Sequence, residues 1–383
     1  TPRWGRRFPG MTWQAWVAVG AAVLAAVGIG IGIWVARRQR QLRTRLDIAG
    51  VPVVEEQPPG SGGPDTLVAV VVNPTKPGTP ALRELVTTTI AGRGWPEPLW
   101  LETTPDDPGV GQARQALEAG AHLVIAAGGD GTVRAVAEAL AHSAVPMGLL
   151  PQGTGNLLAR NLDLPIGNGP SALAIALDGL NRTIDVGRLT VDRWADAEPP
   201  EGAHDENVFL VIGGVGVDAA MVADADEQLK ARVGWIAYFV AAVRHLHGRR
   251  LRVKVKVDDR DWIEVRGRSL LVGNVGRLPG GITLLPDARI DDGWLDLAAL
   301  DARGGVAGWA QLLGEVMLQR IGVRNDLPAK IGRIDHVRAR QVTVQIVGGE
   351  QVQVDGESVG RAKQLSARVD PGALVVRVAP PRT

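Results

Sequence analysis

Two glycine-rich stretches of this 383-residue sequence carry residues that could bind phosphate. The stretch "GGDGT" covers residues 128–132, and "PQGTGN" covers residues 151–156. Glycines let backbone N–H groups approach an anion closely, while threonine and asparagine side chains add hydrogen-bond donors. One such loop is a weak signal, because any tight turn from a strand into a helix favours glycine. Two such loops after neighbouring predicted strands favour a phosphate-binding site.

The segments around these loops predict alternating strands and helices. "TLVAVVVNP" (Thr66–Pro74) and "HLVIAA" (His122–Ala127) are continuous apolar runs, which are typical of strands buried on both faces. Between Val133 and Leu140, apolar residues recur at the spacing of one helix face. This alternation predicts an α/β domain with a parallel sheet that helices cover on both faces. Its loops would meet beyond the carboxyl ends of the strands, where α/β sheets bind ligands.

The pattern changes after about residue 188. "LRVKVKV" (Leu251–Val257) alternates strictly between apolar and charged residues, and "EQVQVDGE" near the C-terminus repeats this period of two. Such alternation indicates antiparallel strands with one buried face. We therefore expect an α/β domain over residues 66–188 and a β-rich, sandwich-like domain over residues 189–383. The C-terminal segment can pack back on the first domain.

The N-terminal region predicts a single transmembrane helix. Residues 13–36 contain no charged side chain, and a helix of that length can cross a hydrocarbon core of about 30 Å at about 1.5 Å per residue. Tryptophans, which prefer the membrane interface, lie near both ends of the run. A cleaved secretory signal is the alternative, disfavoured by the length of the run and by the basic segment after it. We expect an anchor over residues 1–46 and a Pro- and Gly-rich linker over residues 47–65.

Charge around the predicted span indicates its orientation. Five arginines lie between residues 37 and 45, against three before the span. Because positive charge is retained on the cytoplasmic side, the body of the protein is expected in the cytoplasm, beside the inner leaflet of the cell membrane.

Composition excludes several functional classes. The formal net charge of +1 gives no reason to expect a nucleic-acid partner. The absence of cysteine excludes disulfides, thiolate metal sites and cysteine nucleophiles. His245 and His247 are the one close pair of histidines, and the arginines around them favour a solvated helix end over a metal site.

An ordered set of motifs resembles the lipid kinases of the diacylglycerol kinase catalytic family, which includes bacterial diacylglycerol kinases and is related to sphingosine and ceramide kinases. The resemblance covers roughly Asp65 to Ala379. The motifs are "GGDGTV", "PQGTGNLLARNLDLP", "IDVGRL", "GVGVDA", "PDARIDDGWLDL" and "VDGE". The resemblance implies an ATP-binding domain over residues 66–188 and a lipid-substrate domain over residues 189–383, which together transfer the γ-phosphoryl group of ATP to a lipid hydroxyl.

The resemblance also implies a set of nucleotide-binding residues. They are Asn73, Thr104 (with Thr103 as the alternative), Gly128, Gly129, Asp130, Gly131, Thr132, Val133, Gly153, Thr154, Gly155 and Asn156. The sequence departs from the family pattern at two places. "TKPG" replaces the usual Ser-Gly after Asn73, and Leu157 stands where bacterial relatives often carry aspartate. These departures leave the identity of the acceptor lipid open.

Two carboxylates compete for the role of catalytic base. The resemblance makes Glu357, in "VDGE", the proton acceptor for the lipid hydroxyl, although Asp-Gly is also a common signal for a hairpin turn. Asp130 is the alternative, acting through magnesium or the attacking hydroxyl. The resemblance further implies a Mg²⁺ site made by Asp292 and the carbonyls of Arg289 and Trp294, where a simple turn is the alternative.

Two other functions stay open at this stage. An NAD kinase shares the "GGDG" motif, and an inactive membrane-anchored sensor of lipid or nucleotide could keep both loops. The second phosphate loop, "VDGE" and the membrane span favour the lipid kinase, whose partners would be a diacylglycerol-like membrane lipid, ATP and Mg²⁺. Two apolar segments, Gly234–Leu246 and Gly308–Val323, would line an acyl-chain pocket, contact the membrane or form core helices. Assembly as a homodimer stays open.

Overall fold

The computed structural model describes residues 65–200, 202–216, 251–278, 282–302 and 332–381, together with Gly63. The chain divides into two compact units, residues 1–53 and 54–383, and all described residues belong to the second. The predicted membrane span lies outside the described residues, as do the histidine pair and the two apolar segments of the second domain. None of the helices in the described ranges is long and apolar enough to cross a membrane.

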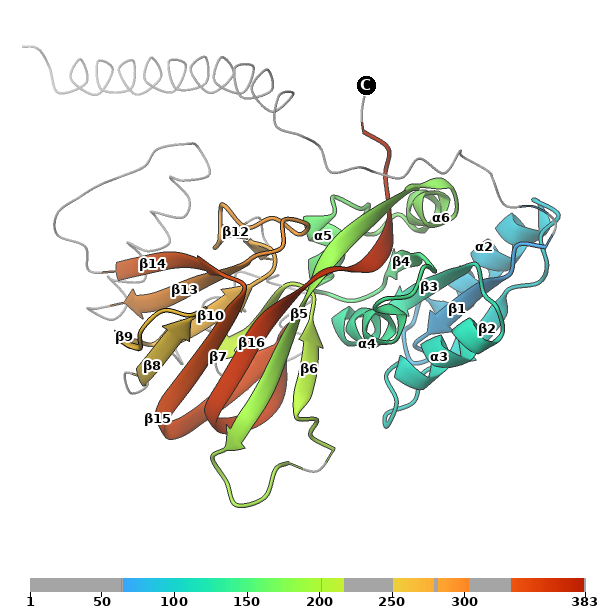
Figure 1. The fold of residues 1–383 in the computed structure, drawn as a ribbon. Helices are drawn as coiled ribbons and strands as arrows, with labels where there is room; N and C mark the ends of the chain where they lie inside the picture. The colour runs from blue at the N-terminus through green and yellow to red at the C-terminus, as the bar shows by residue number, and fades with distance from the viewer. Residues whose placement is uncertain are drawn as a thin grey trace, which may run out of the picture. The chain divides into compact units, whose positions relative to one another are not determined.

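The first part of the described chain is an α/β arrangement (Figure 1). Four parallel strands stand in the order β2-β1-β3-β4. They are β1 (Val68–Val72), β2 (Leu99–Glu102), β3 (Leu123–Gly128) and β4 (Met147–Pro151). The helices of this part are α2 (Thr79–Ala91), α3 (Val110–Glu118), α4 (Asp130–Leu140), α5 (Leu157–Asn161) and α6 (Gly169–Asp178).

Helices cover both faces of these parallel strands. Val68, Val70 and Val72 of β1 belong to one buried cluster together with residues of α2 and α6. Ala69 and Val71 belong to another cluster, shared with α3 and α4. Successive residues of a strand face opposite sides of the sheet, so an uninterrupted apolar run is what a strand covered on both sides requires. The α/β prediction for this part is confirmed.

The second part is rich in β-structure, as predicted. Its strands pair antiparallel. They are β5 (Leu180–Trp194), β6 (Glu206–Phe209), β7 (Ile212–Val215), β8 (Leu251–Val257), β9 (Ile263–Gly267), β10 (Ser269–Gly273), β13 (Leu295–Ala302), β14 (Gly332–Ala339), β15 (Gln341–Val354) and β16 (Glu357–Val378). A separate pair is formed by β11 (Arg277–Leu278) and β12 (Ile282–Thr283). In β8 the valines are buried while Arg252 and Lys254 are exposed, which explains the strict alternation of its sequence.

The strands of the first part are parallel as predicted, but they do not form a separate sheet. Within the described residues, both parts contribute to one mixed 14-stranded sheet. Strand β16 makes the connection, because it pairs antiparallel with β15 and β5 and also runs parallel to β4, with Val376 opposite Met147. Strands β5 and β16 lie side by side along most of their length (Figure 1). The C-terminal strand β16 therefore extends the four parallel strands at the edge formed by β4.

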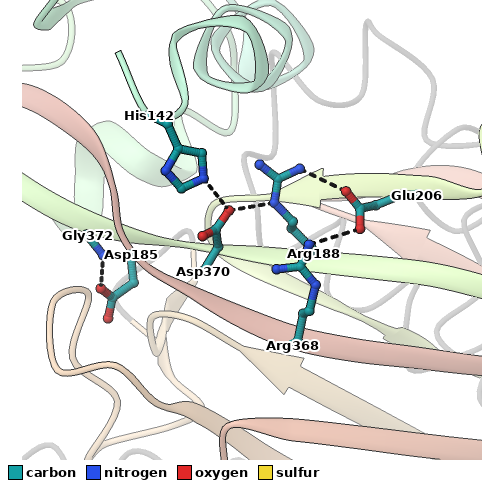
Figure 2. A network of polar contacts seen from close by, with 7 residues as sticks. All are labelled: His142, Asp185, Arg188, Glu206, Arg368, Asp370 and Gly372. Carbon is teal, nitrogen blue, oxygen red and sulfur yellow. Dashed lines mark hydrogen bonds and ion pairs between the residues drawn. The ribbon is translucent and has the colours of Figure 1, made fainter. Parts of the chain in front are cut away.

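Polar side chains also join the end of α4 to strands β5, β6 and β16 (Figure 2). Nε2 of His142 lies 3.0 Å from Oδ2 of Asp370, and Nε of Arg188 donates to the same oxygen at 2.6 Å. Arg188 and Arg368 both pair with Glu206. Burial alone would raise the pKa of Asp370, but the bonds from Arg188 and His142 outweigh it and lower that pKa. The network fixes β16 against the α/β part.

Candidate active site

The two glycine loops touch each other at the carboxyl edge of the parallel strands. Gly128 ends β3 and pairs with Pro151 of β4, so the loops that follow start side by side. A Cβ on Gly153 would lie 2.9 Å from the Cα of Gly129, and a Cβ on Gly128 would lie 2.6 Å from the Cβ of Thr132. Because real side chains do not approach so closely, glycine is required at both positions. The structure thus brings the two predicted phosphate loops together.

Asp130 links these loops. It is the first residue of α4, and its Oδ2 accepts the backbone N–H of Asn156 at 2.9 Å, while Oδ1 accepts that of Leu157 at 2.5 Å. Burial raises the pKa of Asp130, the backbone donors oppose that rise, and the nearby charge of Glu357 adds to it. Both carboxylate oxygens are therefore already engaged in holding the second loop.

Asn156 shapes the second loop. Its backbone is left-handed, with φ 46°, a conformation that asparagine tolerates better than most residues. The buried side chain closes the turn on Gly153, accepting its N–H at 2.9 Å and donating to its carbonyl at 2.6 Å. Thr132 is buried at the start of α4, whereas Thr154 is exposed on the second loop. Of the threonine and asparagine side chains in these two loops, only that of Thr154 is therefore exposed.

Asn73 and Thr104 follow β1 and β2 at the same edge of the sheet, as expected. Their side chains bond within their own loops. Oδ1 of Asn73 accepts the N–H and the hydroxyl of Thr75 at 3.0 and 2.8 Å. Oγ1 of Thr104 accepts the N–H of Asp107 at 3.0 Å, and Thr103 is buried. In this structure both predicted residues stabilise loop shape at the rim of the site.

The "VDGE" motif is a hairpin turn, and this turn brings Glu357 to the first loop. Asp355 and Gly356 have φ values of 47° and 89° and connect Val354 of β15 to Glu357 of β16 in two residues, as type I′ turns do. Oε1 of Glu357 faces Gly131, at the place where any other residue would carry its Cβ. The turn and the catalytic interpretations are therefore compatible.

Asp355 is a residue whose importance the sequence did not reveal. It is buried, and its carboxylate accepts three consecutive backbone N–H groups, from Leu210 at 2.7 Å and from Val211 and Ile212 at 2.9 Å each. Burial raises the pKa of Asp355 to about 6, against the opposing effect of these donors and of Arg134. The Asp-Gly pair signals a turn but not this anchor, because the donors lie about 145 residues earlier in the chain.

The expected metal ligands lie near β13. Oδ1 of Asp292 accepts the N–H of Trp294 at 3.2 Å, and its Oδ2 pairs with Arg338. Asp296 is buried nearby, and its Oδ2 has no hydrogen-bond partner. Burial raises the pKa of Asp296, and the charges of Asp292 and Asp287 raise it further, against the effect of Arg338. This oxygen accepts no hydrogen bond but lies 3.9 Å from Nε of Arg338, so a hard cation there would share the carboxylate with that guanidinium.

No cluster of three or more His, Asp or Glu side chains that could hold a metal occurs in the described part of the chain. The site implied by the family pattern needs one such side chain, since Arg289 and Trp294 would contribute only carbonyls. Asp185 holds the turn at this position, accepting the N–H of Gly293 at 2.7 Å and that of Gly372 at 2.8 Å. A cation held by Asp292 would take the place that Arg338 occupies beside Oδ2 of this aspartate in the structure.

Two family models match the two parts of the chain. Residues 68–189 match the diacylglycerol kinase catalytic domain, and residues 212–378 match the YegS C-terminal NAD kinase beta sandwich-like domain. A Pseudomonas aeruginosa protein named "Probable lipid kinase YegS-like" is 32% identical over 269 residues, which is 69% of this chain and 79% of that protein. A diacylglycerol kinase of Mycobacterium tuberculosis is 31% identical over 183 residues, 48% of this chain and 56% of that protein.

The solved structures add a shared fold. The crystal structure of a diacylglycerol kinase from Bacillus anthracis superimposes with a TM-score of 0.62 at 21% identity, covering 82% of this chain and 97% of that chain. Both glycine loops lie within the matched residues 68–189, and the hairpin lies within the matched residues 212–378. The chain belongs to the diacylglycerol kinase catalytic domain family of lipid kinases.

Proposed function

We propose that this protein is an ATP-dependent lipid kinase that transfers the γ-phosphoryl group of ATP to a hydroxyl of diacylglycerol or a related membrane lipid. The observation that carries the proposal is the position of Glu357, whose carboxylate faces Gly131 within the first phosphate loop. A base at that point can reach a hydroxyl that attacks a phosphate bound to the same loop.

The loops supply what a triphosphate needs. The backbone N–H groups of residues 129–132 lie at the N-terminus of α4. The N-terminus of a helix attracts anions, so these groups suit a phosphate. Thr154 adds an exposed hydroxyl from the second loop, whose shape Asn156 fixes and which Asp130 holds beside the first loop. This arrangement supports binding of the ATP phosphates at the edge that the two touching loops share, with Asn73 and Thr104 at the rim.

The transfer itself needs one base. The lipid hydroxyl oxygen attacks the γ-phosphorus, the bond from that phosphorus to the bridging oxygen breaks, and ADP leaves, while the hydroxyl proton passes to Glu357. The two oxygens of Asp130 are engaged with backbone N–H groups, whereas Glu357 is half exposed. These contacts favour Glu357 as the base and Asp130 as the residue that holds the loops.

Membership of this kinase family implies that the protein uses ATP, and such kinases typically need a divalent cation as well. Asp292, with the carbonyls of Arg289 and Trp294, would hold Mg²⁺ at the edge of β13. When bound, the ion would supply positive charge next to a group of aspartates.

A membrane location would suit this substrate. The uncharged run at residues 13–36 and the arginines after it support a single-pass anchor with the catalytic part in the cytoplasm, at the inner leaflet. Lipid and active site would then share one surface, which raises their effective concentration for each other.

The test is phosphoryl transfer by the full-length chain in lipid vesicles. The chain is incubated with γ-labelled ATP, Mg²⁺ and vesicles containing diacylglycerol, ceramide or monoacylglycerol, with NAD as a soluble acceptor. Label is expected in a lipid. Label in NAD alone would contradict the proposal and identify an NAD kinase. ATP binding without any transfer would instead identify a sensor.

A further inference from the structure

Arg134 is the partner of Glu357 in this structure. It lies on α4, directly after the "GGDGTV" stretch, and its Nη2 forms an ion pair with Oε2 of Glu357, 223 residues later in the chain. The Arg134 side chain is 16% exposed, while that of Glu357 is 49% exposed. A fixed guanidinium therefore holds a carboxylate that still reaches solvent.

The other oxygen of this carboxylate faces the phosphate loop. Oε1 of Glu357 occupies the space beside Gly131 that a Cβ would fill. The carboxylate thus lies between the guanidinium of Arg134 on one side and the loop backbone on the other. Two contacts from α4 define its position, since Gly131 and Arg134 both belong to that helix.

The charges of neighbouring carboxylates also favour an arginine at position 134. Glu357 is close enough to Asp130 to raise the pKa of that aspartate, in addition to the larger effect of burial. Arg134 is close enough to Asp355 to lower the pKa of that buried aspartate, against the larger effect of burial. Arg134 is thus the positive charge beside both Glu357 and Asp355, and its loss would remove the ion pair that holds the half-exposed Glu357 at the loop.

We propose that Arg134 is a positioning residue that holds the Glu357 carboxylate at the phosphate loop for proton transfer. The inference rests on the proposed role of Glu357 as the base. Arg134 itself acts through Glu357 and not on the lipid. Because misplacement of a reacting group by about 1 Å can cost about 100-fold in rate, the loss of this contact should reduce turnover strongly.

The test compares Arg134→Gln and Arg134→Lys with the wild-type chain in the vesicle assay. Arg134→Gln should lower kcat by about 10- to 100-fold and leave the KM for ATP nearly unchanged. Arg134→Lys keeps the positive charge and should recover part of the loss. Arg93→Gln is the matched control, because Arg93, in the turn after α2, forms an ion pair at 2.6 Å with Asp178 at the end of α6, away from the loops. It should lower thermal stability while leaving kcat unchanged.

A double variant separates positioning from a purely structural role. If Arg134 acts through Glu357, Arg134→Gln should cause no further loss of kcat in a Glu357→Gln background. Losses that multiply, a normal kcat for Arg134→Gln, or a loss that Arg134→Lys fails to recover at all would each overturn the inference.

A labelling experiment tests the contact between Arg134 and Glu357 without measuring kinase activity. Carbodiimide and an amine modify accessible carboxylates, and mass spectrometry reports the rate at Glu357. Release from Arg134 should make this rate several-fold faster in Arg134→Gln than in the wild type. An unchanged rate overturns the inference even if the lipid kinase assay succeeds. A faster rate in a chain that phosphorylates no lipid supports the pairing and contradicts the proposed function alone.

Discussion

The carboxylate of Asp130 accepts the backbone N–H of Asn156 at 2.9 Å, so the first residue of α4 is bonded directly to the residue before α5. The N–H of Leu157 donates to the other carboxylate oxygen at 2.5 Å. Gly155 leaves room for this approach, because a Cβ there would lie 2.5 Å from Oδ2 of Asp130. The acidic residue of the first glycine loop thus fixes the second loop, and the proposed phosphate site depends on both.

Replacement of Asp130 by asparagine should weaken ATP binding. An amide keeps one acceptor, but its NH₂ group faces a backbone N–H, so one of the two bonds becomes a repulsive contact. Hydrogen bonds to a charged group contribute about 1.5–3 kcal/mol, which predicts an ATP affinity roughly 10- to 100-fold lower. Calorimetric titration of ATP measures the change.

Asp106→Asn is the control for this variant, because Asp106 is exposed in the loop after β2. It should bind ATP as the wild type does. If Asp130→Asn bound ATP normally and lost only phosphoryl transfer, Asp130 would be the better choice for the base.

Replacement of Gly153 by alanine should separate the two loops. The new Cβ would lie 2.9 Å from the Cα of Gly129, and neither atom belongs to a flexible side chain that could move away. Overpacking of this kind costs about 1–3 kcal/mol, so the affinity for ATP should fall by about 5- to 150-fold where binding needs the loops to touch. Gly78→Ala, at a glycine with open space around it and a φ of −79°, should bind ATP normally. Equal ATP affinities of the two variants would show that the loops need not touch.

Replacement of Glu357 by glutamine should abolish most of the transfer without weakening ATP binding. General-base catalysis typically contributes about 100- to 10,000-fold, and the amide cannot accept the proton. Single-turnover transfer to lipid and a parallel ATP titration distinguish the two effects. Normal turnover of this variant would remove Glu357 from the mechanism and favour Asp130.

The parts of the fold that sequence patterns predicted are those with local signals. An apolar run followed by glycines and a helical period marks β3, its loop and α4 as consecutive residues. Strict alternation marks β8 in the same way. Each pattern lies within one continuous segment of the chain, so no knowledge of distant partners is needed.

The contacts that complete the site have no local signal. The ion pair of Arg134 with Glu357 joins residues 223 positions apart, and Asp355 meets backbone donors about 145 positions away. The pairing of Val376 with Met147, which makes the sheet continuous, likewise depends on strand order and register. Tertiary packing decides these relationships, and a single sequence does not encode them in any one segment.

The buried Asp355 should make stability depend on pH. Folding raises its pKa from 3.8 to about 6, so the folded state binds a proton more tightly than the unfolded state. Its contribution to stability is therefore full below about pH 4 and is lost as the pH rises through about 6, with a total of about 3 kcal/mol at most. The amide of the Asp355→Asn variant does not titrate, so this variant lacks the pH-dependent contribution to stability.

Denaturant unfolding of both proteins at pH 4.5 and pH 7.5 measures this effect. The free energy of unfolding of the wild type, minus that of Asp355→Asn, should be larger at pH 4.5 than at pH 7.5, because other titrating groups cancel in the difference. The sign distinguishes burial from hydrogen bonding as the dominant influence. If the three N–H donors from residues 210–212 dominated, they would lower the pKa, and the difference would instead grow toward pH 7.5.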